Sequence, residues 1–476
     1  MKVINYLLIT TLIASYSIYS QAQNGTHDDV EAVRSIISSK PNDMEKKMKS
    51  YYKANRKNPA NLVAFGKEFL TVNDTINAKE YAKYALEATN NTFAPAYILL
   101  GDIDATNNNI EKAANQYEHA INIEPKEPEA YFKYVALYRK TNPKAAIKKL
   151  ENLHQLRQDT EASIVIGQIY YELEDFQQSA KAYDKSDINK LKEEDLLNYG
   201  MSTYFTKKYN KSLDIAKQGL SNNPRNVIFN RLAFFNSSEL GKWEDAITYA
   251  DALFNKSDST KLSYYDYAIY GKTLRELKQY DKAIEMYHEA LRRIDNARKD
   301  VVSIITEQIS NAYKANGDLT NAIRYFKQHI NNTQSPTFQQ YSTLAGLYCQ
   351  LGMSLTNDAE KIQAYSNADD TYAVIASKFE KADIYCTLMR ARVNSYMDPD
   401  FTKGLALPFY EKIDQVLGSL DVWDSTDKVR LTEAYRYLMA YYFVKGNNTQ
   451  IAKNYAQKLL KVDPENKDAK EILLIK

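Results

Sequence analysis

Residues 271–291 read GKTLRELKQYDKAIEMYHEAL, and their first glycine is followed at offsets of 12, 16 and 19 by Ala283, Tyr287 and Ala290. Residues 101–121, GDIDATNNNIEKAANQYEHAI, keep the same three offsets with Ala113, Tyr117 and Ala120. A recurrence at fixed offsets is the mark of an internal repeat, and it has to be followed along the chain before other patterns are considered.

The offset template fits eight places in the chain. Its first position is occupied by Gly66, Gly101, Gly167, Gly200, Phe234, Gly271, Ser310 and Ala440, and the residue at offset 12 is Ala or Ser each time. Apolar residues spaced by three and four predict amphipathic helices. Between them lie turns in which Gly241 and Gly317 suit the left-handed conformation. We therefore predict helix pairs in which small residues at offsets 0 and 12 face each other and the offset-16 residue fills the space beside the crossing.

The pattern resembles the tetratricopeptide repeat, a 34-residue helix-turn-helix unit. The clearest copy runs from Ala94 to Glu127 and contains AYILLGD, followed at the family's positions by Ala113, Tyr117, Ala120 and Pro125. The resemblance covers nearly all of the chain after its first residues. It implies an all-α, right-handed superhelical solenoid of about eleven repeats, which stack because one helix pair cannot bury its apolar face alone.

The first residues have the character of an export signal. Lys2 precedes an apolar run that contains several polar residues, and Ser20 and Ala22 occupy the two small-residue positions before a cleavage site. An uncleaved membrane anchor is the alternative, which the polar residues within the run disfavour. We predict a signal peptide cleaved after Ala22, and an exported protein that is periplasmic or associated with the outer membrane.

The predicted organisation has five parts. These are a signal peptide (1–22), an N-terminal segment with a half-repeat (23–58), a regular repeat array (59–338), irregular repeats (339–432), and a final repeat with a capping helix (433–476). The only two cysteines are Cys349 and Cys386, and they fall in successive repeats. A disulfide between them is one interpretation, and two small buried side chains are the better supported one.

Composition and motifs disfavour several functions. Lys plus Arg is 62 and Asp plus Glu is 60, so the surface lacks the basic excess of a nucleic-acid binder. No phosphate-binding glycine loop, nucleophile elbow or zinc-protease motif is present, and the five histidines have no metal-ligand spacing. We predict a protein that is not an enzyme and that holds no metal and no cofactor.

In the family that the chain resembles, partners bind on the inner, concave wall that the first helices form. On this chain the resemblance gives an apolar and aromatic run between 128 and 263, made of Phe132, Tyr171, Leu197, Met201, Tyr204, Phe205 and Phe235. Packing of these side chains against the neighbouring repeat is the alternative. A fainter set suits an acidic C-terminus, as in the carboxylate-clamp members of the family: Lys272, Arg275, Asn311 and Lys314.

These observations predict a non-catalytic scaffold or adaptor of the bacterial cell envelope that binds partner peptides or proteins. The partners expected are envelope or outer-membrane proteins. A glycan-binding protein that resembles the outer-membrane starch-binding group is the alternative, although the chain lacks a lipid-bearing cysteine near its start and long loops between repeats. An enzyme within the irregular stretch 339–426 is the weakest hypothesis. The sequence does not identify the partner.

Overall fold

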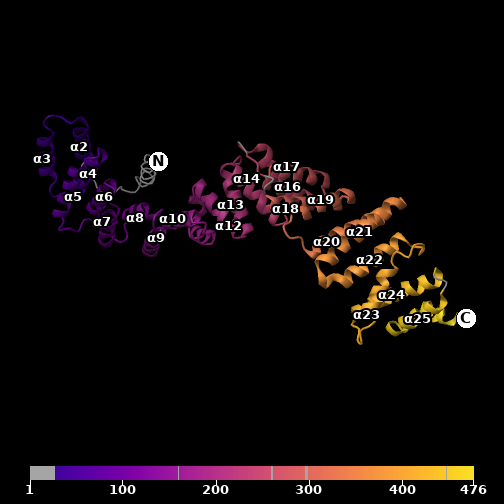
Figure 1. Ribbon diagram of the computed structural model, residues 1–476. Helices are drawn as coiled ribbons and strands as arrows, with labels where there is room; N and C mark the ends of the chain where they lie inside the picture. The colour runs from indigo at the N-terminus through magenta and orange to yellow at the C-terminus, as the bar shows by residue number, and fades with distance from the viewer. Residues whose placement is uncertain (1–26, 159, 259–260, 295–297, 446–447, 476) are drawn as a thin grey trace. The chain divides into compact units, whose positions relative to one another are not determined.

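The computed structural model describes residues 27–158, 160–258, 261–294, 298–445 and 448–475. Every regular element within these ranges is a helix, as Figure 1 shows, so the predicted all-α class is confirmed. The predicted signal peptide, with its cleavage site after Ala22, lies outside the described residues.

The helices follow one another in packed pairs, and the chain divides between Asn236 and Ser237, within α14, into two compact units. The first unit contains α2 (His27–Ser39), α3 (Met44–Asn55), α4 (Pro59–Thr71), α5 (Thr75–Glu87), α6 (Ala94–Thr106), α7 (Ile110–Ile123), α8 (Pro128–Tyr138), α9 (Pro143–Arg157), α10 (Thr160–Glu172), α11 (Phe176–Tyr183), α12 (Glu193–Phe205) and α13 (Tyr209–Asn222). Helix α14 (Val227–Glu239) carries the division.

The second unit continues with α15 (Trp243–Asp251), α16 (Tyr264–Glu276), α17 (Tyr280–Arg292), α18 (Lys299–Ala315), α19 (Leu319–Asn332), α20 (Phe338–Ser354), α21 (Asp358–Lys378), α22 (Asp383–Met397), α23 (Leu407–Leu417), α24 (Ser425–Val444), α25 (Thr449–Val462) and α26 (Lys467–Leu474). Three short elements complete the description, η1 (Ile188–Lys190), η2 (Ala252–Lys256) and η3 (Glu380–Ala382).

The turns within the pairs have a common construction. The residue seven positions after the start of the template has a positive φ, which is 69° at Gly241 and 85° at Gly317, as predicted. Non-glycine residues take the same conformation in other repeats, namely Asn73, Asn108, Glu174, Lys207 and Lys278. An Asp or Asn then caps several second helices; Asp74 accepts a hydrogen bond from the Asn77 amide at 3.0 Å and Asp318 from the Asn321 amide at 2.9 Å.

The glycine at the start of the template makes room for an aromatic ring. A Cβ atom at Gly101 would lie 2.3 Å from Tyr117 Cε1, and one at Gly271 would lie 2.7 Å from Tyr287 Cε1. The offset-16 ring therefore lies on the glycine that begins the template, where a side chain at that position would collide with it. The close approach of offsets 0 and 12 also occurs, since the Ser179 hydroxyl donates a hydrogen bond to the Gly167 carbonyl at 2.9 Å.

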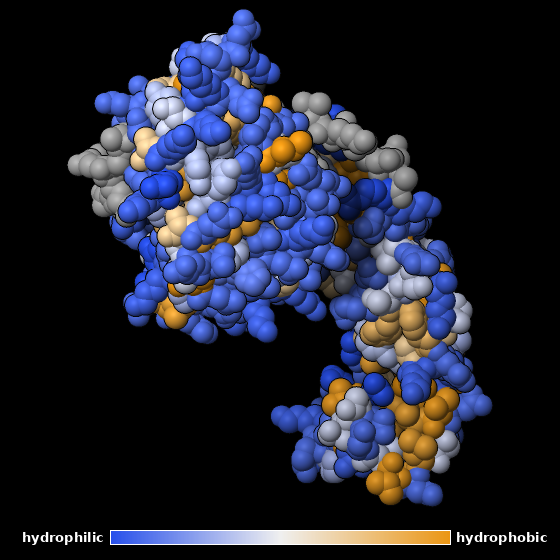
Figure 2. Space-filling view, turned by 90° about the vertical axis from the view of Figure 1, so that its left-hand side faces the viewer, coloured by the Kyte–Doolittle hydropathy of each residue, from blue (hydrophilic) through white to orange (hydrophobic). Residues whose placement is uncertain are grey.

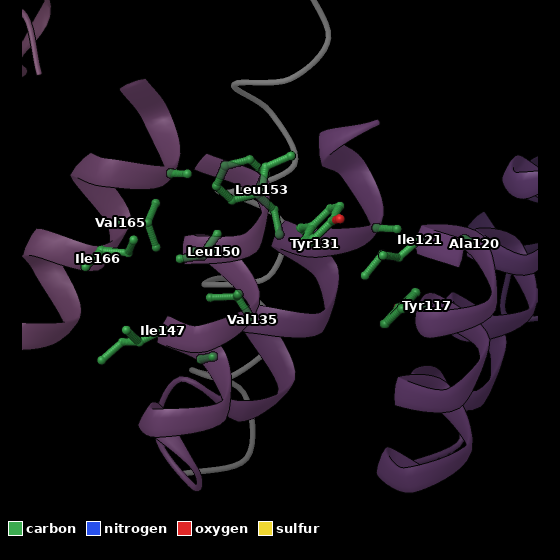
Figure 3. Packing of buried hydrophobic residues seen from close by; sticks show 14 of the residues in the cluster. Tyr117, Ala120, Ile121, Tyr131, Val135, Ile147, Leu150, Leu153, Val165 and Ile166 are labelled. Carbon is green, nitrogen blue, oxygen red and sulfur yellow. The ribbon is translucent and has the colours of Figure 1, made fainter. Parts of the chain in front are cut away.

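Apolar side chains from consecutive helices interlock to form the core of the first unit. Figure 3 shows this packing for α7 to α10, where Leu150 and Leu153 of α9 lie between side chains of α8 and α10. Both leucines are fully buried. Burial of a leucine side chain stabilises the folded state by roughly 1.5–3 kcal/mol. Each helix pair is therefore held mainly by the pairs before and after it.

The front of the chain contains a helix that the sequence did not predict. Residues 23–58 were expected to hold a half-repeat, but α2 precedes α3 and buries Val33 and Ile37. Arg34 forms two hydrogen bonds with Glu68 of α4, at 2.8 and 2.9 Å. The segment therefore contains a pair of helices that covers the end of the apolar core.

Two features stand out in the irregular stretch. Between α22 and α23, the Asp398 carboxylate accepts hydrogen bonds from the amides of Lys403 at 2.9 Å and Gly404 at 2.7 Å, which fixes the loop.

The second feature of the irregular stretch is the cysteine pair. Cys349 is half-buried and Cys386 is buried, and both thiols are free, so the disulfide interpretation is wrong for this structure.

Hydrogen-bonded ion pairs join the first helices of neighbouring pairs. The partners are 31 to 34 residues apart, close to one repeat length, in Arg34–Glu68, Asp102–Lys133, Arg139–Glu172 and Glu239–Lys272. We call these pairs the ion-pair ladder. Pairs that are open to solvent each contribute little stability, about 0–1 kcal/mol, and their main effect is to favour one register between helices.

Candidate functional site

The predicted binding residues lie on α8, α10, α12 and α14. Tyr171 is in the last turn of α10, and Tyr204 and Phe205 end α12. The following turns reverse the chain through Glu174 and Lys207, which both have a φ of 59°. Each reversal places the first residue of the next helix beside the aromatic residue that precedes the turn.

We give the name aromatic ridge to six rings, each of which contacts at least one other: Tyr171, Phe176, Tyr204, Phe205, Tyr209 and Phe235. The shortest contact is a stack between Phe176 of α11 and Phe205 of α12, with ring centroids 4.5 Å apart and planes inclined by 30°. Tyr204 contacts Phe205 and Tyr209 at 5.8 Å and Phe235 at 6.2 Å. The rings thus connect three successive repeats.

The rings differ in their access to solvent. Phe205 is 49% exposed, whereas Phe235 is 8% exposed and anchors the ridge on α14. Tyr171 and Tyr204 are half-buried. The ridge is therefore an apolar surface supported from beneath, and exposed aromatic surface of this kind is a common anchor for partner proteins.

Three predicted residues lie outside the ridge. Phe132 is 7% exposed and belongs to the core that α7 to α10 share, so it has the packing role that was the alternative interpretation. Leu197 is half-buried and packs against the apolar cluster of α11 to α14. Met201 is half-buried on α12.

The sequence analysis missed Phe176 and Tyr209. They begin the second helices α11 and α13, nine residues after Gly167 and Gly200. The inner-wall pattern of the family concerns only first helices, so it does not include these positions. The signal was present, because Tyr280 also stands nine residues after Gly271.

Polar contacts hold the helices that carry the ridge. Arg139 bonds Glu172 of α10 at 2.7 and 3.0 Å, and Gln168 donates a hydrogen bond to Asp195 of α12 at 2.7 Å. The Tyr183 hydroxyl also donates to Asp195, at 3.2 Å. Burial, and then the Asp195 charge, raises the pKa of Tyr183, so this hydroxyl stays protonated and remains a donor.

Two of the three cations of the faint carboxylate-clamp set, Lys272 and Arg275, have partners within the chain. Lys272 bonds Glu239 at 2.9 Å, and Arg275 bonds Gln308 at 2.5 Å and Glu276 at 2.8 Å. An acidic peptide end at this place would have to displace these contacts. The geometry thus favours the aromatic ridge over the clamp as the candidate site.

Figure 2 shows one face of the molecule, on which hydrophilic residues predominate and hydrophobic residues gather in separate patches. Within the ranges that the structure covers, no cluster of three or more His, Cys, Asp or Glu side chains could hold a metal ion. None of the described helices combines the length and apolar composition needed to cross a lipid bilayer.

Comparison with known families finds tetratricopeptide repeats. The family model described as "Tetratricopeptide repeat" matches residues 94–127 and 267–296. These segments correspond to α6–α7 and to most of α16–α17. The chain therefore contains tetratricopeptide repeats and has the stacked helix pairs of that fold. No curated protein matches the chain.

Several solved structures of tetratricopeptide repeat proteins are similar to this chain. The C-terminal part of a TPR repeat-containing protein from Cytophaga hutchinsonii is 24% identical, with a TM-score of 0.42, and the match covers 59% of this chain and all of that one. A tetratricopeptide repeat protein from Parabacteroides merdae is 19% identical, with a TM-score of 0.31, over 53% of this chain and 98% of that one.

Proposed function

We propose that this chain is a non-catalytic scaffold, and that the aromatic ridge docks an apolar segment of a partner protein. The fold is that of protein-interaction scaffolds. The observation that carries the proposal is the Phe176–Phe205 stack, because it presents a 49% exposed ring that is already fixed by its neighbour. A ring held in place loses little conformational freedom on binding, which favours affinity.

The partner that fits this surface is a peptide segment with large apolar side chains. The ridge extends over rings from α10 to α14, so an extended or helical segment can contact more than one repeat at once. Contacts with several repeats increase the apolar area removed from water, which is the main source of binding free energy.

The test compares two serine substitutions in the full chain. Phe205→Ser removes the exposed ring of the ridge, and Tyr396→Ser removes a ring of equal 49% exposure on α22 in the other unit. After cross-linking in intact cells, we expect the amount of partner attached to the Phe205→Ser variant to fall at least tenfold. The amount attached to the Tyr396→Ser variant should stay unchanged. Equal retention by both variants, with unchanged circular dichroism, would exclude the ridge as the docking site.

We also propose that the scaffold acts in the cell envelope, where it would join envelope or outer-membrane proteins. The support is the apolar run after Lys2 and the small residues Ser20 and Ala22. Intact mass of the cellular protein tests this, since export predicts a mature chain that begins at Gln23. A mass that retains residues 1–22 would contradict cleavage. Titration with oligosaccharides tests the glycan-binding alternative in the same preparation.

A further inference from the structure

One position on the first helices contacts the preceding repeat in seven of the described helix pairs. It lies two residues after the start of the template. In three pairs of the first unit and in one of the second it is apolar and packs in the same core cluster as the small residue on the second helix of the preceding pair. These apolar residues are Ile103, Leu137, Ile169 and Ala312. The pair α8–α9 has one residue fewer in its turn, so Val135 marks its start and Ala146 is its small residue.

Three successive first helices carry a polar residue at this position instead. Ser202 of α12 donates a hydrogen bond to the Ser179 hydroxyl at 2.9 Å, and the Asn236 amide of α14 donates to the Ser212 hydroxyl at 2.8 Å. Thr273 of α16 lies 3.1 Å from the hydroxyl of Ser238. All six side chains are at most 1% exposed, and each bond lies within one of the two units. We call these six residues the polar seam.

Helix α14 also contains buried polar atoms that are poorly satisfied. Among the described residues, Asn236 Oδ1 and Ser237 Oγ have no hydrogen-bond partner. A buried polar atom without a partner destabilises the folded state, because it gives up its bond to water and gains none. The division of the chain into two compact units falls between these same two residues.

The polar seam affects the free energy needed to separate neighbouring helix pairs. Exposure of apolar side chains such as Ile103 and Ile169 to water raises the free energy of the opened state. Hydroxyl and amide groups regain hydrogen bonds from water, so opening a polar contact costs less than opening an apolar one. In a repeat array, cooperativity depends on the contacts between neighbours, and a weak contact separates the array into independently opening parts.

We infer that the polar seam is a built-in opening point, at which helices α12 to α16 separate from their neighbours in the native state while the helices on either side stay folded. The same helices α12 and α14 carry Tyr204, Phe205 and Phe235 of the aromatic ridge. Opening at the seam would therefore move helices that carry the ridge, and this inference stands whether or not the ridge binds a partner.

Hydrogen exchange of the full chain, followed by mass spectrometry, tests the inference. Backbone amides of α12, α13, α14 and α16 should exchange at least tenfold faster than those of α6 to α10 and of α18 and α19. Equal protection across these helices would overturn the inference.

An apolar variant tests the cause. It combines Ser179→Ala, Ser202→Ala, Ser212→Ala, Asn236→Leu, Ser238→Ala and Thr273→Val, and it should slow exchange in α12 to α16 at least fivefold. If it does not fold, the pair Ser238→Ala and Thr273→Val should slow exchange in α14 and α16. Unchanged exchange in the folded variant would show that the seam does not set the opening point.

Ser310→Ala is the matched control. Its hydroxyl is equally buried and, like that of Ser179, bonds a carbonyl within its own helix pair, here that of Ala322 at 2.7 Å. It differs from the seam serines in that its bond lies within the pair and does not join neighbouring repeats. Its effect should stay within α18 and α19 and leave exchange in α12 to α16 unchanged. A change in α12 to α16 as large as that of the apolar variant would count against a specific role for the seam.

Discussion

The ring of Tyr117 lies on the backbone of Gly101, so that a Cβ atom at position 101 would come within 2.3 Å of the ring. We therefore predict that Gly101→Ala destabilises the first unit by about 1–3 kcal/mol, because the ring or the helix must shift to admit a methyl group. The free energy of unfolding in urea, measured from circular dichroism, checks this value.

Gly346→Ala provides the control for this substitution. Gly346 also lies inside a helix, α20, but among the described residues no atom beyond the adjacent helix backbone lies within 4 Å of an added Cβ. The variant should be stabilised by about 0.5–1 kcal/mol, since alanine restricts the unfolded chain and favours the helix. Destabilisation of both variants to the same extent would show that helix propensity, and not the ring, explains these glycines.

Two buried tyrosines at equivalent positions should respond differently to loss of the hydroxyl. Tyr117 donates a hydrogen bond to Asp102 at 2.8 Å, whereas the Tyr287 hydroxyl is buried and has no partner among the described residues. Tyr117→Phe should cost about 1–2 kcal/mol, and Tyr287→Phe should be neutral or stabilising by up to about 1 kcal/mol. Urea unfolding of both variants measures the difference. An equal loss in both would contradict the hydrogen-bond explanation.

Stability should fall in alkaline solution. Burial raises the pKa of Tyr287 and of Tyr199 from 10.0 to about 12 in the folded protein. Between these values the unfolded chain has already released the phenol proton and the folded chain has not. Stability is therefore complete below pH 10 and decreases as pH rises toward 12, by up to about 1.4 kcal/mol per pH unit for each buried tyrosine.

The urea midpoint at pH 9, 10 and 11 checks this dependence. The Tyr287→Phe variant should lose less stability over the same interval, because it lacks one of the titrating groups. A midpoint that stays constant from pH 9 to pH 11 would contradict the raised pKa values.

The Asp398 carboxylate should protect the loop that follows it. It accepts hydrogen bonds from the amides of Lys403 and Gly404, so Asp398→Ala should release this segment. We expect trypsin to cleave after Lys403 at least tenfold faster in the variant. Asp400→Ala, two residues further on in the same loop, should leave the rate unchanged. Equal rates in both variants would show that the loop is held by other contacts.

The repeats could be predicted because their signal is local. Glycine or another small residue, the left-handed turn residue and the small offset-12 residue follow one another within one helix pair, so their spacing is fixed by helix geometry. The conformation of Gly241 and Gly317 was predicted in this way. Helix α2 was missed because its apolar contacts, Val33 and Ile37, face α4 and not a partner within a recognisable repeat.

The candidate site was predicted only in part, because exposure depends on contacts between repeats. Phe132 and Phe205 both satisfied the rule for the inner wall, yet Phe132 is 7% exposed and Phe205 is 49% exposed. The neighbouring helices determine the difference, and one sequence does not show how closely they approach. The polar seam was also not predicted, since Ser202 and Asn236 occupy positions that look like ordinary helix surface until the preceding repeat is in place.

The ion-pair ladder gives the array a fixed order. Asp102 is the negative partner of Lys133 in the next repeat, whereas Arg139 is the positive partner of Glu172 in the next repeat. The sign of the charge that a repeat presents to the following repeat therefore differs from one contact to another. Exchanging two repeats would separate these charged partners even where it leaves every apolar contact intact. Repeats that share the same pattern of glycines and alanines thus differ in the charges that they present to their neighbours. A shuffled or duplicated repeat would leave charged side chains without their partners.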